Sequence, residues 1–297
     1  MINFDAFIGH LRYEKRSSAN TVSAYEGDLR QFAEYIEKIL EVTELEKVTA
    51  GDIRTWILTL LEDGKLSARS VNRKMSALRD FYRFELKAGR VKHNPMDGIQ
   101  GPKFREKLPE YVEQKDMEKL FSVELFGDNF EGRRDRLILE LFYATGMRLS
   151  ELLNIKRLDL DLYNSSVKVL GKRNKERIIP FGNRMRELLT KYLEYYVENI
   201  APENENFYIF VAANGRQLYP KAVYRIVRKY LDMVTTIDKR SPHVIRHTFA
   251  THMLNRGADL NAIKEILGHS SLAATQVYTH NSMEQLKSIY KQAHPRA

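Results

Sequence analysis

A charged segment with repeated glycine and proline divides this chain near residue 100. Residues 98–109 read GIQGPKFREKLP, a composition typical of a linker between domains. A chain of 297 residues is long for a single hydrophobic core and suits two. We therefore predict an N-terminal domain over residues 1–97, a linker over 98–110 and a second domain over 111–297.

The first domain has the apolar spacing of amphipathic helices. Between residues 18 and 38, apolar side chains recur at alternating steps of three and four: Val22, Tyr25, Leu29, Phe32 and Ile36. Thr49 begins a second helix, and residues 67–88 form a third that Gly89 ends. With a short helix over residues 3–13, the pattern predicts a four-helix bundle.

The helix that begins at Ser67 carries a basic face. At 100° per residue, its apolar side chains cluster on one side: Val71, Met75, Leu78, Tyr82 and Leu86. The opposite side carries cations: Arg69, Arg73, Arg79, Arg83, Lys87 and Arg90. A solvated face is the alternative, but such faces usually mix charge signs. Because the whole chain carries a net charge of +9, we predict that this face contacts the phosphates of a polyanion.

The second domain is predicted to be mostly helical with one β-hairpin. Two β-prone runs flank a basic turn between Ser166 and Phe181. Helical patterns occupy residues 116–125, 133–145, 183–198, 219–233, 243–255, 259–267, 271–279 and 283–292. The predicted fold class is therefore mainly α with a small β element.

Composition excludes several kinds of site. The absence of cysteine excludes disulfides, thiolate zinc sites and cysteine nucleophiles. His243 and His247 are four residues apart, but no His-Glu-x-x-His pattern or acidic cluster accompanies them, so no metal is expected. No P-loop is present, so no nucleotide cofactor is expected either. No apolar run reaches the ~18 residues that span a membrane, and the N-terminus does not resemble a signal peptide, which favours a cytoplasmic protein.

Four segments occur in a distinctive order. They are ATGMRLSEL at residues 144–152, GKRNKER at 171–177, HVIRH at 243–247, and LGH at 267–269 with Tyr278 nine residues further on. Together they resemble the tyrosine recombinase (phage integrase-like) family. The closest resemblance is to Xer-type recombinases, which also share HTFATHML at 247–254 and the ending HPRA. Arg173 departs from the pattern, since Xer-type sequences usually have glycine there.

The resemblance implies a role for each matching residue. Tyr278 matches the nucleophile, Arg148 and Arg246 match the two arginines that activate the phosphate, and His243 matches the general base. Attack on a phosphodiester builds negative charge on its oxygens. Arginine stabilises that charge, because its guanidinium group is planar and stays protonated. An unperturbed tyrosine has a pKa near 10, so its attack requires nearby cations and a proton acceptor.

Three further residues take roles from the same resemblance. Lys172 matches the general acid toward the leaving 5′-oxygen, although Lys175 on the same hairpin competes for that role. His269 matches the donor of a hydrogen bond to the scissile phosphate. Glu151 would orient Arg148 from behind the site; a simple ion pair between the two is the alternative.

The resemblance also implies an architecture and partners. The N-terminal bundle would be a SAM-like DNA-binding domain, and the second domain would have the DNA breaking-rejoining fold, the two forming a clamp around duplex DNA. Recombination would proceed through a Holliday junction in a homo- or hetero-tetramer, with no metal or ATP, and with a DNA translocase as a potential activator. The C-terminal helix over 283–292 would dock on a neighbouring protomer; packing on its own domain is the alternative.

Other functions remain open at this level. A mobile-element integrase would share the chemistry, but such enzymes often carry an arm-binding domain for which the chain leaves no room before its first helix. A type IB topoisomerase would share the phosphotyrosine intermediate. A non-catalytic DNA-binding protein would be expected to lose the active-site residues, and none is lost.

Overall fold

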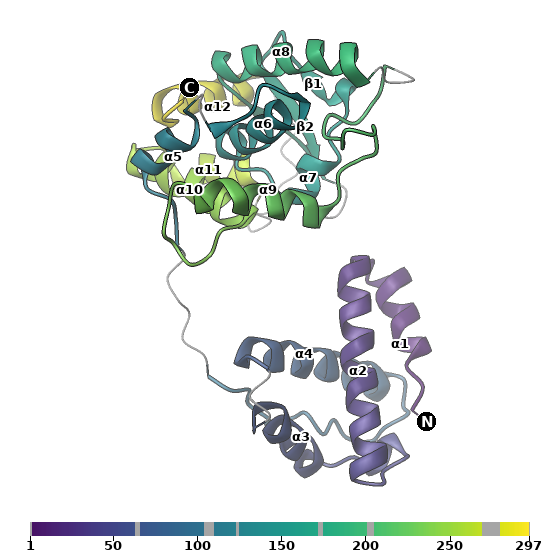
Figure 1. Ribbon diagram of the computed structural model, residues 1–297. Coiled ribbons are helices and arrows are strands. Elements are labelled where there is room, and N and C mark those ends of the chain that lie inside the picture. The colour runs from purple at the N-terminus through teal and green to yellow at the C-terminus, as the bar shows by residue number, and fades with distance from the viewer. Residues whose placement is uncertain are drawn as a thin grey trace. The chain divides into compact units, whose positions relative to one another are not determined.

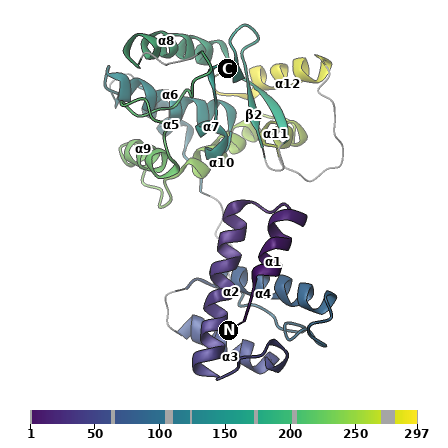
Figure 2. The same ribbon diagram turned by 90° about the vertical axis from the view of Figure 1, so that its right-hand side faces the viewer.

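The chain forms two compact units, Met1–Lys107 and Leu108–Ala297, each with its own hydrophobic core. The computed structural model describes residues 2–62, 66–103, 110–122, 125–171, 175–200, 205–268 and 280–296. Figures 1 and 2 show both units in two orientations, and each is described by itself below. No helix in these described ranges is long and apolar enough to cross a membrane.

All regular elements described in the N-terminal unit are helices. Its elements are α1 (Asp5–Gly9), the π-helical η1 (His10–Glu14), α2 (Ala19–Ile39), the 3-10 turn η2 (Leu45–Lys47), α3 (Ala50–Glu62) and α4 (Ala68–Lys87). Ser18 and Ser67 cap α2 and α4 by accepting hydrogen bonds from the backbone N–H groups of Thr21 and Ser70. These helices occupy nearly the predicted ranges, and the four-helix organisation is confirmed.

The core of this unit is aromatic at its centre. Trp56 from α3 packs edge-on against Phe32 from α2, with ring centroids 4.9 Å apart, and both side chains are buried. Val71, Met75, Leu78 and Tyr82 of α4 are buried as the periodicity predicts. Leu86, assigned to the same face, is instead 41% exposed, because it lies in the last turn of α4 at the edge of the core.

The segment after α4 packs on the N-terminal unit as far as Pro102. Val91, Met96 and Ile99 are buried, and the Asn72 amide donates a 2.9 Å hydrogen bond to the Pro102 carbonyl. Gly101 approaches Asn72 so closely that a Cβ would lie 1.7 Å from its Oδ1. The first residues of the predicted linker therefore belong to this unit, and residues 104–109 lie outside the described residues.

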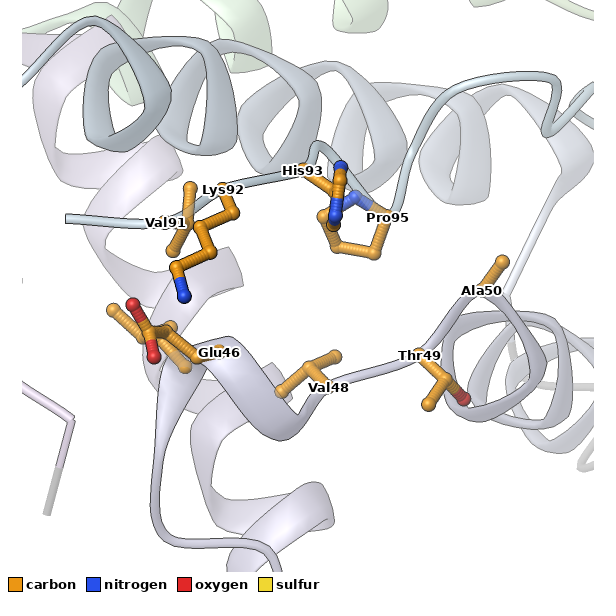
Figure 3. Close-up of a pocket in the computed structure, with 9 residues that line it drawn as sticks. Glu46, Val48, Thr49, Ala50, Val91, Lys92, His93 and Pro95 are labelled. Atoms are coloured by element: carbon orange, nitrogen blue, oxygen red, sulfur yellow. The ribbon is translucent and has the colours of Figure 1, made fainter. Parts of the chain in front are cut away.

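A pocket of about 290 Å³ opens on the N-terminal unit. One wall comes from η2 and the start of α3, and the other from the segment after α4 (Figure 3). Lys92 points from the second wall toward Glu46 on the first, while Val48, Val91 and Pro95 make the lining partly apolar. The motif residues all lie in the other unit, so this pocket is not the site that they form.

The C-terminal unit is built around α6 (Phe130–Thr145), which lies between α8 (Asn183–Ile200) and α10 (Pro242–Asn255) (Figure 1). Leu137, Ile138, Leu141 and Phe142 of α6 are all buried, so neighbouring elements cover this helix on several sides. The remaining helices are α5 (Gln114–Leu120), α7 (Leu149–Leu153), the 3-10 turn η4 (Arg157–Asp159), α9 (Pro220–Asp232), α11 (Leu260–Leu267) and α12 (His280–Ala293).

A small antiparallel sheet completes this unit, in the order β1 (Leu160–Asp161), β2 (Ser166–Leu170), β3 (Glu176–Pro180). In the β2–β3 hairpin, Val167 pairs with Ile179 and Val169 with Arg177, so these side chains share the inward face. The predicted hairpin is confirmed in its strands, and its tip, residues 172–174, lies outside the described residues. β1 was not predicted.

The C-terminal helix packs on its own unit, beside α10, α11 and β3. Leu286 and Tyr290 of α12 are buried. Beyond it, the His294 ring stacks on Tyr290 at 4.7 Å, and Arg296 donates a 2.8 Å hydrogen bond to the buried Glu140. Packing within the protomer is thus the arrangement in this structure, and docking on a neighbouring protomer stays a prediction.

Candidate active site

Arg148 is placed by a sharp turn after α6. Gly146 ends that helix with φ of 59°, and a Cβ there would lie 2.5 Å from a ring carbon of Phe249 and 2.8 Å from Leu267. Glycine is thus required both for the left-handed backbone and for the close packing. Arg148 follows as the N-cap residue of α7, and its backbone N–H donates a 2.6 Å hydrogen bond to Glu151.

The Glu151 carboxylate is buried between two arginines. Its Oε1 accepts hydrogen bonds from Arg148 Nη1 at 2.8 Å and from Arg177 Nη1 at 2.7 Å. Its Oε2 accepts one from Arg177 Nη2 at 2.9 Å, besides the bond from the Arg148 backbone. Burial alone would raise the pKa of this carboxyl, but the bonds and charge from Arg177 and the donors of Arg148 outweigh it and hold the pKa at about 2.

Arg246 reaches the same place from the first turns of α10. Its side chain is mostly buried and donates to the carbonyl of Gly146 at 2.6 Å and to that of Leu267 at 2.7 Å. Burial and the like charges of Arg148 and Arg177 lower its pKa to about 10, although Glu151 acts in the opposite direction. Arg246 therefore stays protonated at neutral pH.

The C-terminal end of α11 holds all three guanidinium groups. The carbonyls of Ile266, Leu267 and Gly268 accept hydrogen bonds from Arg177 at 2.8 Å, Arg246 at 2.7 Å and Arg148 at 3.0 Å respectively. The last carbonyls of a helix lack intrahelical partners and lie at the negative end of its dipole, so cations stabilise them. Gly268 closes the helix with φ of 64°.

This arrangement can bind an anion. Three guanidinium groups meet at this helix end and only one carboxylate, Glu151, pairs with two of them, which leaves an excess of positive charge in a mostly buried setting. A phosphate diester carries a negative charge and two non-bridging oxygens, which the paired N–H groups of a guanidinium can bind. The arginines are held in place before any ligand arrives, which is the condition for stabilising charge that develops during a reaction.

The structure brings together part of the predicted site. Arg148, Glu151 and Arg246 converge as described, and His243 lies on α10 one turn before Arg246 with its side chain exposed. Lys172, His269 and Tyr278 lie outside the described residues. Lys175 is described: it is exposed, and its carbonyl accepts a 2.8 Å hydrogen bond from the Gly171 N–H at the base of the hairpin tip.

Sequence reasoning missed Arg177 as a site residue. The hairpin pattern contained a signal for it, because Arg177 occupies a position facing the same side as Ile179. A charged side chain on the inward face of a strand requires a partner. The partner had to come from a distant part of the sequence. The pattern therefore indicated that Arg177 needs an anionic partner, but not that this partner is Glu151.

The described histidines belong to no cluster of metal-ligating side chains. Among the described residues, no group of three or more His, Cys, Asp or Glu side chains could hold a metal ion. His252 is buried with its Nδ1 2.8 Å from the Tyr143 hydroxyl. Burial lowers the pKa of His247 and His252, as expected for packed neutral imidazoles.

The predicted basic face of α4 is partly engaged within its own unit. Arg73 forms an ion pair with the buried Asp28, which also accepts a 2.8 Å hydrogen bond from the buried Lys74. Arg90 forms a bidentate pair with the buried Glu85 at 2.6 and 2.9 Å. Within the predicted set, Arg79 donates to the Ile99 carbonyl at 3.2 Å, Arg83 lies 3.9 Å from Asp80, and Arg69 and Lys87 are exposed.

A second basic surface lies on α9, where sequence reasoning had not placed one. Tyr219, the N-cap residue of α9, and the exposed side of the helix interleave aromatic rings with cations, in the order Tyr219, Lys221, Tyr224, Arg225, Arg228 and Lys229. The side chains of Tyr219 and Tyr224 are 54% and 38% exposed, whereas the other face of α9 is buried. Aromatic groups beside arginines suit contacts with a nucleic acid backbone and its sugars.

Comparison with known proteins identifies the family of this chain. The Phage integrase family matches residues 110–285, and the Phage integrase N-terminal SAM-like domain matches residues 4–89. The tyrosine recombinase XerC of Chlorobaculum parvum is 39% identical over 99% of this chain and 94% of its own length. XerC of Staphylococcus carnosus is 40% identical over 99% of this chain and 97% of its own. This chain belongs to the phage integrase family.

Solved structures of this family share the fold. The XerH site-specific recombinase bound to a palindromic difH substrate matches with a TM-score of 0.72 and 21% identity over 95% of this chain and 78% of its own. The integrase of transposon Tn1549, in complex with transposon right-end DNA, gives 0.71 and 19% over 94% and 96%. The predicted family and the mainly helical fold with a small β element are confirmed.

Proposed function

We propose that this protein is an Xer-type site-specific tyrosine recombinase, which cuts and rejoins duplex DNA through a 3′-phosphotyrosyl bond at Tyr278. The observation that carries the proposal is the convergence of Arg148 and Arg246 on the end of α11. These two arginines come from separate elements, and the chain that leaves α11 leads to His269 and Tyr278. Full-length relatives named XerC, about 40% identical, support the Xer-type assignment.

The arginines supply the electrostatic part of the reaction. A phosphodiester seated on Arg148 and Arg246 would place its non-bridging oxygens against two preorganised cations. As the phosphorus becomes five-coordinate, negative charge grows on those oxygens, and the guanidinium groups stabilise it. Because Arg246 keeps a pKa of about 10, it retains its charge through the neutral range in which such an enzyme works.

The covalent steps follow from the roles of the remaining residues. The Tyr278 oxygen attacks phosphorus and its proton passes to His243, while the bond from phosphorus to the 5′-oxygen breaks. Lys172 donates the proton that the leaving 5′-oxygen needs, and His269 binds the phosphate through a hydrogen bond. In the reverse step a 5′-hydroxyl of the partner strand attacks the phosphotyrosyl bond. The bond energy is conserved, so neither ATP nor a metal is required.

DNA binding would use both units. The exposed cations of α4 in the N-terminal unit and the basic, aromatic side of α9 in the C-terminal unit both suit the phosphate backbone. The excess charge of +9 is consistent with such a polyanionic ligand.

The assembly we propose is a tetramer on two recombination sites, formed with copies of this chain or with a related recombinase. Strand exchange would pass through a Holliday junction, with α12 exchanged between protomers and a DNA translocase as activator. A cytoplasmic location accompanies this role.

An integrase of a mobile element is the second candidate. The fold does not separate the two, since XerH and the Tn1549 integrase match with TM-scores of 0.72 and 0.71. Sequence favours the Xer-type role, because the XerC proteins match this chain over nearly their whole length.

A nicked suicide substrate tests the proposal. Duplexes that carry candidate chromosomal dimer-resolution sites should trap a covalent protein–DNA adduct when a nick lets the short fragment with the new 5′-hydroxyl diffuse away. Wild type should form this adduct and Tyr278→Phe should not. If wild type forms none on any candidate site, or the phenylalanine variant forms as much, the proposal is wrong. Adducts on transposon ends alone would favour the mobile-element role.

The general acid can be identified with the same assay. Lys172→Ala should slow cleavage, and a substrate with sulfur in place of the bridging 5′-oxygen should restore it, because a thiolate leaves without a proton. Rescue of Lys175→Ala instead would assign the role to the second lysine.

A further inference from the structure

Arg177 is the strongest partner of Glu151, although nothing in the proposed reaction requires it to touch DNA. Its two terminal nitrogens bind both carboxylate oxygens, at 2.7 and 2.9 Å. The Arg148 side chain donates only one bond to the same carboxylate, at 2.8 Å. Bidentate pairs of this kind are the stronger ones, so Glu151 is held mainly by Arg177.

The two arginines that bind Glu151 also differ in exposure. The side chain of Arg177 is 6% exposed, whereas that of Arg148 is 23% exposed. Arg177 is therefore enclosed by protein, while Arg148 presents part of its guanidinium to a ligand. The charge balance gives the two arginines different roles, since one guanidinium neutralises the carboxylate and the other remains available for an anion.

We propose that Arg177 is a positioning residue, which neutralises Glu151 and thereby leaves Arg148 in place to bind the scissile phosphate. The inference deepens the proposed function and rests on it. Without Arg177, the buried carboxylate would keep Arg148 as its main cationic partner. A buried carboxylate without sufficient compensation is costly, so it would draw the Arg148 fork into a bidentate pair. Arg148 would then bind Glu151 at the expense of the phosphate.

A second contact of Arg177 supports the same role. Its Nε donates a 2.8 Å hydrogen bond to the Ile266 carbonyl, two residues before the carbonyl of Gly268 that holds Arg148. Arg177 thus joins β3 to the helix end on which Arg148 and Arg246 also rest. Its removal would loosen both attachments of Arg148, the one to Glu151 and the one to α11.

The first experiment measures adduct formation in single turnover on the suicide substrate. Arg177→Gln should reduce the rate about 100-fold, the loss expected when a reacting group is displaced by about 1 Å. Binding of the intact site should change little, because Arg177 is enclosed. Adding Glu151→Gln to Arg177→Gln should recover much of the rate, since no carboxylate then competes for Arg148. Arg177→Lys keeps the positive charge but not the bidentate geometry, so its rate of adduct formation should lie between those of Arg177→Gln and wild type.

A neutral phosphate separates positioning from general damage. In a methylphosphonate, a methyl group replaces one non-bridging oxygen, so the substrate needs less cationic stabilisation. The rate loss caused by Arg177→Gln should shrink on this substrate, as should that caused by Arg148→Ala. Combining the two substitutions should cost little more than Arg148→Ala alone, because Arg177 acts through Arg148.

Arg134 provides a matched control. It is a buried arginine of the same unit, paired with Asp135 at 2.7 Å and bonded to the Val211 carbonyl at 3.1 Å. It lies about 16 Å along α6 from Thr145, the end of the helix that leads to the site. Arg134→Gln should lower the unfolding midpoint, while its adduct rate per folded molecule should match wild type on both substrates.

A stability cycle tests the capture of Arg148 without any DNA. Arg148→Ala should lower the unfolding midpoint more in the Arg177→Gln background than in wild type, because Arg148 is then the main cation at Glu151. An equal or smaller effect overturns the proposal even if wild type proves inactive on every DNA site. With an active wild type, an equal rate loss on phosphate and methylphosphonate would also overturn it. If the substrate with sulfur in place of the bridging 5′-oxygen restores the rate of Arg177→Gln instead, Arg177 supports the hairpin lysine. That result would refute the proposal that Arg177 acts through Arg148.

Discussion

Replacing Glu151 by glutamine should destabilise the C-terminal unit in a manner that depends on pH. The carboxyl has a pKa of about 2 in the folded protein, against an ordinary value of 4.5. A lowered pKa means that the ionised form favours folding, and the difference corresponds to about 3 kcal/mol. This contribution is fully present above pH 4.5 and is lost as the pH falls through 2. Glutamine resembles the protonated acid and lacks it throughout.

The single tryptophan makes the measurement specific to one unit. Trp56 is buried in the N-terminal unit, so its fluorescence during urea unfolding reports on that unit alone. Circular dichroism follows the urea unfolding of both units. An unfolding transition that appears in circular dichroism but not in Trp56 fluorescence belongs to the C-terminal unit. At pH 7 the circular dichroism midpoint of Glu151→Gln should lie well below that of wild type. The Trp56 midpoint should coincide in the two proteins.

Lowering the pH should bring the two proteins together. Between pH 5 and pH 2.5, wild type should lose most of its advantage, while other titrating groups affect both proteins alike and cancel in the difference. A constant difference across this range would show that the ionised carboxylate does not stabilise the fold. Equal stability at pH 7 would refute the reasoning more directly, since it would mean that burial offsets the whole gain from the arginines.

Three further outcomes are expected. Gly268→Ala places a Cβ 3.1 Å from the Arg177 guanidinium, so it should slow adduct formation in single turnover. Gly257→Ala is the control, since Gly257 also has a positive φ but open surroundings, and it should slow the reaction less. Lys74→Met leaves the buried Asp28 with one cation fewer and should cost the N-terminal unit about 2 kcal/mol, measured by tryptophan fluorescence in urea. Arg225→Gln should weaken DNA binding and reduce the slope of log affinity against log salt by about 1, measured by anisotropy, with no change in unfolding midpoint.

The helices were the predictable part of this fold. Their starts follow from local chemistry, as at Ser18 and Ser67, whose side chains cap the first turn. Their buried faces follow from apolar periodicity, which failed at the edge of the core, where Leu86 is exposed. The two-residue strand β1 was not predicted, because an element of that length has no period to detect.

The basic face of α4 shows what local pattern cannot supply. Charge sign and helical angle placed Arg73 and Arg90 on one surface with the other cations. The pattern could not reveal that Asp28, from another helix, is buried beneath Arg73 and bound by Lys74 as well. Side-chain partners separated by 45 residues in sequence are a tertiary property. A role for these arginines in DNA binding stays a prediction, since carboxylates of the same unit compete with DNA phosphates for Arg73 and Arg90.

The site follows the same rule. Arg148 and Arg246 were identified by resemblance to a family, since no local feature distinguishes them from the other arginines of a basic chain. What positions them is a helix end 120 and 21 residues away, and three consecutive carbonyls there accept their bonds and that of Arg177. The chain leaving this helix end carries His269 and Tyr278. The groups proposed to bind the phosphate and the segment that bears the proposed nucleophile are therefore both attached to this helix end. A change at Gly268 would disturb both at once, because its backbone ends the helix, holds Arg148 and lies against Arg177.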